Sequence, residues 1–345
     1  MTEAYDGRQV VGMDLHRRRS VLVRMTLDGR KLETARITNS PQALRAVIGR
    51  AGECPLVVVE ATYGWYWAVD VLAAAGAQVQ LAHPLGVKAF SYRRVKNDER
   101  DAADLADLAR MGRLPQAWIA PEPVRAVREV TRFRHKLVQQ RTSCKDQVHA
   151  VLAKAGITVT RSDLFGRGGG LWLDQLVLAQ PYAGKVAALR ALIAVLDGQI
   201  GLLGEQAAGM LAADAGYAAV RELPGIGPVL GAVIVAEIGD ITRFAKPGQL
   251  ASWAGLTPRH HESGTRVIRG HVSKQGSRML RWALCEAIQR QPAGTRPQQV
   301  KDGIIARRGE QARNIAKTAA ARVLLTQVFY AWRDGHARSA RRPAG

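Results

Sequence analysis

The chain has 345 residues and is 47% hydrophobic, enough to bury the cores of two domains or of one domain with insertions. Its 50 Lys and Arg against 29 Asp and Glu give a net charge of +21, spread along the chain, which favours nucleic acid as a partner. The three scattered cysteines exclude a disulfide framework and a zinc spacing and fit a reducing cytoplasm. The polar N-terminus predicts no signal peptide, and we expect no apolar run long enough to span a membrane.

The first part of the chain alternates strand and helix patterns. An Asp28-Gly29 turn separates two of the expected strands. The run "PLVVVE" is continuously apolar before its acid, which is typical of a buried parallel strand. This order favours a mixed sheet flanked by helices. The expected elements are strands over 9–15, 19–27 and 31–37, a helix over 41–51, a strand over 55–60, a helix over 65–75 and a strand over 77–84.

Two further helices are expected over 98–111 and 124–154. The second carries cations on the faces that its apolar residues leave open. These cations could belong to an ordinary solvated face, but with so few acids beside them a surface that faces phosphates is slightly favoured. They are Arg125, Arg128, Arg132, Arg134, Lys136, Arg141 and Lys145, of which we single out Arg128, Arg132 and Lys136 as candidates for binding nucleic acid.

A heptad pattern follows a glycine-rich connection at 156–170. Its apolar positions alternate spacings of three and four, which indicates a coiled coil or a tight helical hairpin. Two interpretations stay open at this point: a helix that forms oligomers, or a helix packed on its own chain. The heptad residues are Val186, Leu189, Ile193, Leu196, Ile200, Leu203, Ala207 and Met210.

Acidic residues mark two strand ends and one helix start. Asp14 lies near the end of the first strand, and Glu60 ends a later one. Asp98, Asp101 and Asp104 recur every third residue on the helix that follows. If these acids gather, they form a self-repelling cluster that hard cations such as Mg²⁺ would neutralise, a site suited to phosphodiester cleavage. Alternatively, the helix acids satisfy the helix dipole and Asp14 pairs with an arginine; the residues alone leave the choice open.

The segment "ELPGIGPVLGAVIVAEIG", residues 222–239, resembles a helix-hairpin-helix. Gly225 and Gly227 would let the backbone approach closely, and amides at the start of the second helix would hold a phosphate without reading base sequence. An ordinary helical turn is the alternative.

The segment 263–288 contains an amphipathic helix with Ser277 as its expected N-cap. Ser273 lies just before that cap, in a predicted loop. The cations around it would hold a phosphate and assist an attacking serine oxygen, although an ordinary loop serine is the simpler interpretation. They are Arg269, His271, Lys274 and Arg278.

Taken in order, these motifs resemble the bridge-RNA-guided insertion-sequence transposases of the family numbered one hundred and ten, relatives of the Piv invertase. The resemblance rests on "VVGMDLH", on the stretch from "VVVEATYG" to "KNDERDAADLA", and on "ELPGIGPVLGAVIVAEIGDITRF" through "GLTPRHHESG" to "HVSKQGSRMLR". It implies an α/β, RuvC-like (RNase H-type) catalytic domain over 1–155. A linker with coiled-coil helices over 156–215 and a mainly α domain with the helix-hairpin-helix over 216–345 would follow.

The same resemblance implies a site and partners. The metal ligands would be Asp14, Glu60, Asp98 and Asp101 with Mg²⁺, and Asp104 is the competitor for one helix position. Ser273 would attack a DNA phosphate, in a site built with the metal domain across subunits of a dimer or tetramer. Donor and target DNA would be chosen by a noncoding bridge RNA, in the bacterial cytoplasm at the nucleoid and without a membrane. A junction resolvase that uses only the four acids, or a catalytically idle nucleic-acid-binding protein, are the rival interpretations.

Overall fold

The computed structural model describes residues 5, 7–90, 97–263 and 266–338. The chain divides into two compact units, Met1–Ile119 and Ala120–Gly345. The expected boundary lay near residue 155, whereas the first unit ends before the long helix that begins at Glu122, which packs with later helices of the second unit. Each unit is therefore described by itself.

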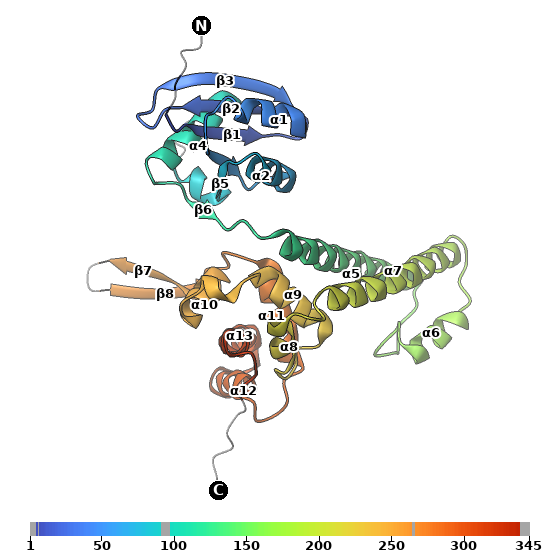
Figure 1. Ribbon diagram of the computed structural model, residues 1–345. Coiled ribbons are helices and arrows are strands. Elements are labelled where there is room, and N and C mark those ends of the chain that lie inside the picture. Colours follow the sequence, from blue (N-terminus) through green and yellow to red (C-terminus); the bar gives the residue numbers. More distant parts are fainter. Residues whose placement is uncertain (1–4, 6, 91–96, 264–265, 339–345) are drawn as a thin grey trace. The chain divides into compact units, whose positions relative to one another are not determined.

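Unit 1 is built on a six-stranded mixed sheet of order β3-β2-β1-β4-β5-β6 (Figure 1). The first three strands form an antiparallel meander, β4 and β5 run parallel to β1, and β6 returns antiparallel to β5. The mixed α/β sheet predicted from the sequence is confirmed. The strands are β1 (Val10–Leu15), β2 (Arg19–Met25), β3 (Lys31–Thr38), β4 (Leu56–Glu60), β5 (Gln78–Ala82) and β6 (Gln116–Ala117).

Helices cover both faces of this sheet, which is why its central strands are apolar on both sides. Val11 and Met13 of β1 pack in the core below α1 and α2, whereas Val10 packs in the core below α4. Ser40 caps α1 by accepting from the Ala43 amide, and Pro41 begins the helix. The helices of this unit are α1 (Pro41–Ile48), α2 (Trp65–Ala74), α3 (Pro84–Lys88) and α4 (Asp98–Arg110).

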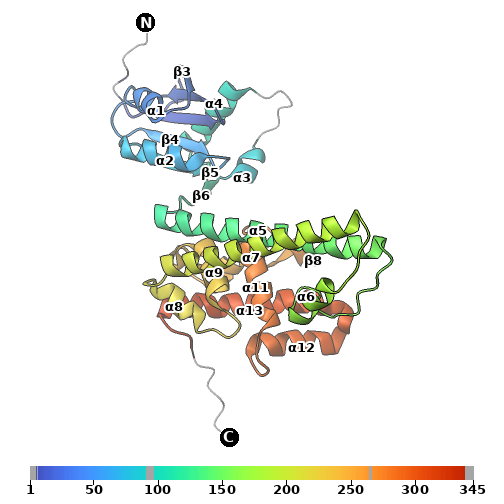
Figure 2. The ribbon, with the colours of Figure 1, turned by 90° about the vertical axis from the view of Figure 1, so that its right-hand side faces the viewer.

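Unit 2 begins with a long helical hairpin. Helix α5 (Glu122–Lys154) and helix α7 (Tyr182–Met210) lie side by side, with the short α6 (Arg167–Asp174) in the connection between them (Figure 2). Arg141 of α5 forms an ion pair of 2.6 Å with Asp197 of α7. Arg134 of α5 donates to the carbonyl of Ile200 at 3.1 Å. These contacts fix the two helices against each other.

One line of the predicted heptad residues is buried in this hairpin: Val186, Ile193, Ile200 and Ala207. They pack within their own chain, as expected from the interpretation of a helix packed on its own chain. The opposite face of α7 leaves Leu192, Val195 and Leu202 exposed. A role of α7 in oligomers stays a prediction.

Among the described residues, α7 is the one helix whose length and apolar composition would suffice to cross a membrane. The expectation that no run is long enough was therefore wrong. The many alanines and glycines of α7 make the helix apolar, although only 17% of its most apolar stretch is buried. A single helix of this kind is weak evidence for a membrane.

Most of the remaining helices of unit 2 enclose one apolar core, to which the ends of α5 and α7 contribute. A two-stranded ribbon, β7 (Pro258–Ser263) and β8 (Arg266–Val272), precedes the expected amphipathic helix. That helix, α11 (Arg278–Gln289), packs against α9 and α13. The other elements are α8 (Ala215–Arg221), α9 (Pro228–Ile238), η1 (Ile241–Arg243), α10 (Pro247–Trp253), α12 (Arg296–Arg308), η2 (Glu310–Ala312) and α13 (Arg313–Asp334).

Candidate functional site

The two strand-borne acids, Asp14 and Glu60, lie on the same face of the sheet. Strands β1 and β4 are parallel neighbours, and their register pairs Met13 with Val59, one residue before each acid. Side chains alternate along a strand, so Asp14 shares a face with Val10 and Glu60 with Val58. Both valines pack in the core below α4. The acids therefore lie at the end of the sheet on the face that α4 covers.

Gly12 brings α4 down onto this face. A Cβ atom at Gly12 would lie 1.8 Å from the carbonyl oxygen of Ala102 in α4, closer than any real contact. Only glycine leaves room for a helix backbone at that distance. Asp98 stands four residues before Ala102 and therefore on the same helix face. The close approach at Gly12 thus carries Asp98 towards the end of β1.

Asp14 and Asp98 meet around His16. The His16 Nε2 atom lies 3.0 Å from Asp14 Oδ2 and 3.4 Å from Asp98 Oδ2. One ligand atom from each of the three residues lies within 4.8 Å of the others. His16 was not among the residues predicted from the sequence. Its signal was the spacing of two after Asp14, which puts both side chains on one face where a strand ends.

The turn that carries His16 is held by Asn39, which follows β3. Asn39 donates its side-chain amide to the His16 carbonyl at 2.7 Å and accepts from the Ser20 hydroxyl at 2.7 Å. The backbone of His16 is therefore held in place relative to β2 and β3, which limits where its imidazole can lie.

The first turn of α4 is anchored by Glu99. Its carboxylate bonds to Lys31, to Thr34 Oγ1 at 3.0 Å and to Arg36 at 2.8 Å, all on β3. The hydrogen bond from Lys31, with those from Thr34 and Arg36, lowers the pKa of Glu99 to about 2. The side chain of Asn97 caps the helix by accepting from the Glu99 amide. Asp98 and Asp101 thus project from a helix start that is fixed to the sheet.

The remaining predicted acids differ in their positions. Asp101 and Glu60 are half-buried, but neither joins the group formed by Asp14, His16 and Asp98. Asp104 is exposed, on the side of α4 away from its buried residues. Helix geometry thus turns Asp98 and Asp101 more towards the sheet than Asp104. The ligand set as a whole stays a prediction.

This donor set fits a divalent metal. Two carboxylates held together repel each other unless a cation or a proton lies between them, and carboxylate oxygens are the ligands that hard cations take. An imidazole adds a nitrogen ligand, which widens the choice beyond Mg²⁺ to metals such as Mn²⁺.

In unit 2, Ser273 begins a tightly bonded loop between β8 and α11. The Ser273 amide donates to the Thr257 carbonyl at 2.8 Å, and the Lys274 amide donates to the Gly255 carbonyl at 3.1 Å. Lys274 has a φ of 55°, in the left-handed region that residues with a Cβ rarely occupy. Such a backbone persists only where its surroundings fix it, so this loop has one defined shape.

Ser277 caps α11, as predicted. Its hydroxyl oxygen accepts from the Leu280 amide at 3.1 Å and donates its proton to Glu237 Oε2 at 2.7 Å. Both functions of this hydroxyl are therefore used within the protein.

The predicted phosphate-binding cations fall into two groups. Lys136, His271, Lys274 and Arg278 are exposed. Arg128 donates to the carbonyls of Ala236 and Glu237 at 2.6 and 2.9 Å, and Arg132, although 45% exposed, forms an ion pair with the Glu237 carboxylate. These two arginines thus hold α5 to α9, and their binding of nucleic acid stays a prediction. The side chain of Arg269 lies outside the described part of the chain.

The glycines of the turn between α8 and α9 serve different purposes. Gly225 has a φ of 81°, and a Cβ there would lie 2.5 Å from the Ala287 carbonyl of α11. Gly225 therefore allows a close approach to the backbone of α11 in the same chain. Gly227 is the N-cap of α9 and has open space beside it. Phosphate binding by these amides stays a prediction.

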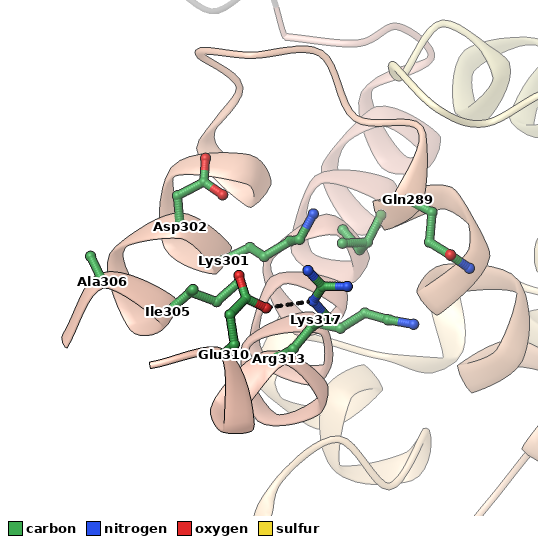
Figure 3. A pocket seen from close by; sticks show the side chains of 9 residues that line it. Gln289, Lys301, Asp302, Ile305, Ala306, Glu310, Arg313 and Lys317 are labelled. Carbon is green, nitrogen blue, oxygen red and sulfur yellow. Dashed lines mark hydrogen bonds and ion pairs between the residues drawn. The ribbon is translucent and has the colours of Figure 1, made fainter. Parts of the chain in front are cut away.

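A cleft of about 580 Å³ opens between α11, α12, η2 and α13 (Figure 3). Its lining carries both positive and negative side chains, and two of them, Arg313 and Glu310, form an ion pair of 2.8 Å. No predicted site residue lines it. The lining residues are Ile288, Gln289, Lys301, Asp302, Ile305, Ala306, Glu310, Arg313 and Lys317.

The chain thus consists of a mixed α/β unit with two acids and a histidine at the end of its sheet, followed by a mainly helical unit. Residues 11–157 match the DEDD transposase family of IS110 elements, and residues 217–301 match the family described as "Transposase IS116/IS110/IS902 family". The chain belongs to the IS110 family of transposases.

Relatives of this chain carry transposase names. A "probable family 20 transposase" of Pseudomonas aeruginosa is 30% identical, over 64% of this chain and 65% of that protein. The transposase of insertion element IS1111A of Coxiella burnetii is 27% identical, over 66% of this chain and 63% of that protein. The match thus spans slightly less than two thirds of either relative's length. The pilin gene-inverting protein of Moraxella bovis is 40% identical over 18% of this chain and 20% of its own.

Among solved structures, RuvC of T. thermophilus in complex with a Holliday junction substrate is similar to part of the chain. It is 20% identical with a TM-score of 0.25, over 32% of this chain and all of that one.

Proposed function

We propose that this protein is a DNA transposase or recombinase of an insertion sequence, which cuts and rejoins DNA strands. The observation that carries the proposal is the meeting of Asp14 and Asp98 around His16. The family and the basic charge of the chain support it.

Asp14, Glu60, Asp98 and Asp101 would hold Mg²⁺ at the end of the sheet on the α4 side. A divalent ion there supplies charge neutralisation for a phosphate and for the oxygens that enter and leave it. The protein's own contribution is to keep Asp14 and Asp98 close, through Gly12 and the anchored start of α4. A preformed site of this kind loses no free energy to reorganisation during the reaction.

Ser273 would be the nucleophile. Its Oγ forms a bond to the DNA phosphorus, the bond from phosphorus to one deoxyribose oxygen breaks, and that oxygen takes a proton. The proton of the serine hydroxyl leaves to water. One phosphodiester bond is thus exchanged for another, so attack by a different DNA hydroxyl can reverse the step and rejoin the strands without an outside energy source.

Donor and target DNA and a noncoding bridge RNA would be the partners, in the bacterial cytoplasm at the nucleoid. The exposed cations Lys136, Lys274 and Arg278 would hold backbone phosphates without reading base sequence. Base pairing with the RNA would then select the DNA sites. The metal and serine sites would be combined within a dimer or tetramer.

The test is denaturing electrophoresis of the protein after incubation with bridge RNA, labelled donor DNA and Mg²⁺. We expect a protein–DNA adduct with the wild type and with Asp104→Ala, and none with Asp14→Ala, Asp98→Ala or Ser273→Ala. Ser277→Ala is the matched serine control: it keeps the Ser273 hydroxyl and should still form the adduct, at a lower rate. An adduct that persists in Ser273→Ala but is lost in Ser277→Ala would refute the choice of nucleophile.

A nuclease that uses only the four acids is the second candidate, because the acidic cluster lies on a unit with its own cores. If the protein is such a nuclease, the Ser273→Ala variant should still cleave DNA in the presence of metal, and no protein–DNA adduct should form. An idle nucleic-acid-binding protein would cleave nothing.

A further inference from the structure

We propose that Glu237 is a positioning residue for the loop that carries Ser273, and that it acts through Ser277. This inference rests on the proposed function in one respect, since it takes Ser273 as the group to be positioned. Its structural half, that Glu237 fixes the shape of the loop over 273–277, stands on the contacts alone.

Glu237 is a charged residue at the centre of unit 2. It belongs to α9, whose other residues are almost all apolar, and its side chain is only 3% exposed. A carboxylate in such a place is costly unless it is paired and hydrogen-bonded. Two partners meet that requirement. Arg132 of α5 donates to both carboxylate oxygens, at 2.8 and 3.2 Å, and Ser277 donates to Oε2 at 2.7 Å.

The network therefore joins three helices that are distant in sequence. Arg132 comes from α5, Glu237 from α9 and Ser277 from the start of α11. Arg128, one turn before Arg132, donates to the main-chain oxygens of Ala236 and Glu237. The end of α9 is thus held to α5 through its backbone as well as through its carboxylate.

Ser277 transmits this anchor to the loop. Its oxygen accepts from the Leu280 amide while its proton goes to Glu237, so both the direction of α11 and the end of the loop depend on one hydroxyl. A serine rotates freely unless its proton has a fixed acceptor. Glu237 is that acceptor.

The remaining contacts close the loop around this point. Arg281, one turn into α11, donates to the carbonyls of Gln275 and Gly276 at 3.2 and 3.1 Å. A Cβ at Gly276 would lie 1.8 Å from the Trp253 carbonyl, so the loop presses against the end of α10. With its start bonded to Thr257, the loop is held at both ends and in the middle. Release of Ser277 would free one end.

The geometry accounts for a carboxylate at position 237 where an apolar residue would fill the core more simply. An apolar side chain could pack between α5 and α11 but could not accept the proton of Ser277. Displacing a reacting group by about 1 Å can cost on the order of 100-fold in rate. The network thus has a purpose beyond packing.

The experiment compares Glu237→Ala, Glu237→Gln and Ser277→Ala with a core control. Val233 lies one turn earlier on α9 in the same buried core, and its side chain has no polar atom that could bond to Ser277, so Val233→Ala is the control. The first readout is hydrogen exchange in the full-length protein, measured on peptides that span residues 270–278. The second is the single-turnover rate of strand cleavage, well below the melting temperature of every variant.

We expect Glu237→Ala and Ser277→Ala to speed exchange of the Ser273 and Lys274 amides, and Val233→Ala to leave it unchanged. The cleavage rate should fall about 100-fold in Glu237→Ala with unchanged DNA binding, and Glu237→Gln, which keeps an acceptor oxygen, should recover part of it. The double variant Glu237→Ala with Ser277→Ala should be no slower than Glu237→Ala alone.

Unchanged loop exchange in Glu237→Ala would overturn the inference, as would equal loosening in Val233→Ala. The proposed nucleophile has a separate test. If Ser273→Ala keeps full strand exchange while Glu237→Ala still loosens the loop, the serine assignment fails and the structural half of the inference stands.

Discussion

Gly12 of β1 lies directly against the carbonyl of Ala102 in α4, with room for no side chain between them. This contact decides how near the helix comes to the sheet. It therefore also decides whether Asp98, four residues before Ala102, can approach Asp14, two residues after Gly12. A glycine with no chemistry of its own thus sets the dimensions of the acidic site.

Gly12→Ala should separate the two acids. The added methyl group must push α4 outward, which we expect to cost about 1–3 kcal/mol of unfolding free energy and to abolish DNA cleavage in the folded protein. Gly49→Ala is the control, because a Cβ there would stay 3.4 Å from its nearest neighbour, the Arg45 carbonyl, at an ordinary helical φ. Urea unfolding and the adduct assay check both. An active Gly12→Ala variant would show that the close approach is not needed.

Asp98 and Asp104 should differ in metal binding. If Asp98 is a ligand, Mg²⁺ or Mn²⁺ should raise the melting temperature of the wild type and of Asp104→Ala, because a ligand that binds only the folded state stabilises it. Asp98→Ala should show no such rise. The measurement is thermal unfolding with the metal and with EDTA. If the metal response is lost in Asp104→Ala and kept in Asp98→Ala, Asp104 is the ligand and the assignment of Asp98 is wrong.

His16 should tune the choice of metal. An imidazole nitrogen binds Mn²⁺ more readily than Mg²⁺, which prefers oxygen ligands. We therefore expect His16→Gln to weaken Mn²⁺ binding more than Mg²⁺ binding, as measured by calorimetric titration. Equal losses for both ions would indicate that the ring acts only as a hydrogen-bonding partner of Asp14 and Asp98.

Acid should weaken unit 2 through Glu237. Burial acts to raise the pKa of this carboxyl, but the hydrogen bonds and charges of Arg132, Ser277 and Arg128 outweigh it and hold the pKa below its ordinary value of 4.5. A lowered pKa in the folded state means that the group stabilises the protein above about pH 4.5 and that this contribution is lost as the pH falls further. Glu237→Gln should therefore flatten the acid limb of a urea stability profile taken from pH 6 to 3.

Removing Arg132 leaves the buried carboxylate without its main partner. We expect Arg132→Ala to cost about 3 kcal/mol at pH 7, because an unpaired buried charge is strongly destabilising. The loss should shrink in acid, where Glu237 is protonated. An equal loss at both pH values would contradict the ion-pair account.

The two faces of α7 should respond differently to charge. Ile193 is buried against α5, so Ile193→Glu should cost more than about 3 kcal/mol and open the hairpin. Val195 is 64% exposed on the opposite face, so Val195→Glu should change the folding free energy by less than about 0.5 kcal/mol. If that face joins subunits, Val195→Glu should yield a folded, smaller species by light scattering. An unchanged oligomer would place the subunit contact elsewhere.

Periodicity and capping in the sequence determined most of the local structure. The strands around Asp14 and Glu60, the helix that begins at Asp98 and the cap at Ser277 follow from apolar patterns and from side chains that bond to nearby backbone. These features are local, because each depends on residues within a few positions. The heptads of α7 likewise indicated a partner helix, although not which one.

Only the tertiary structure decided which distant residues meet. It placed His16 beside Asp14 and Asp98, it made α5 part of the second unit, and it bonded Arg128 and Arg132 to Glu237. No pattern in the sequence predicts such contacts. They depend on how closely whole elements pack, and that in turn depends on single features such as the missing side chain at Gly12.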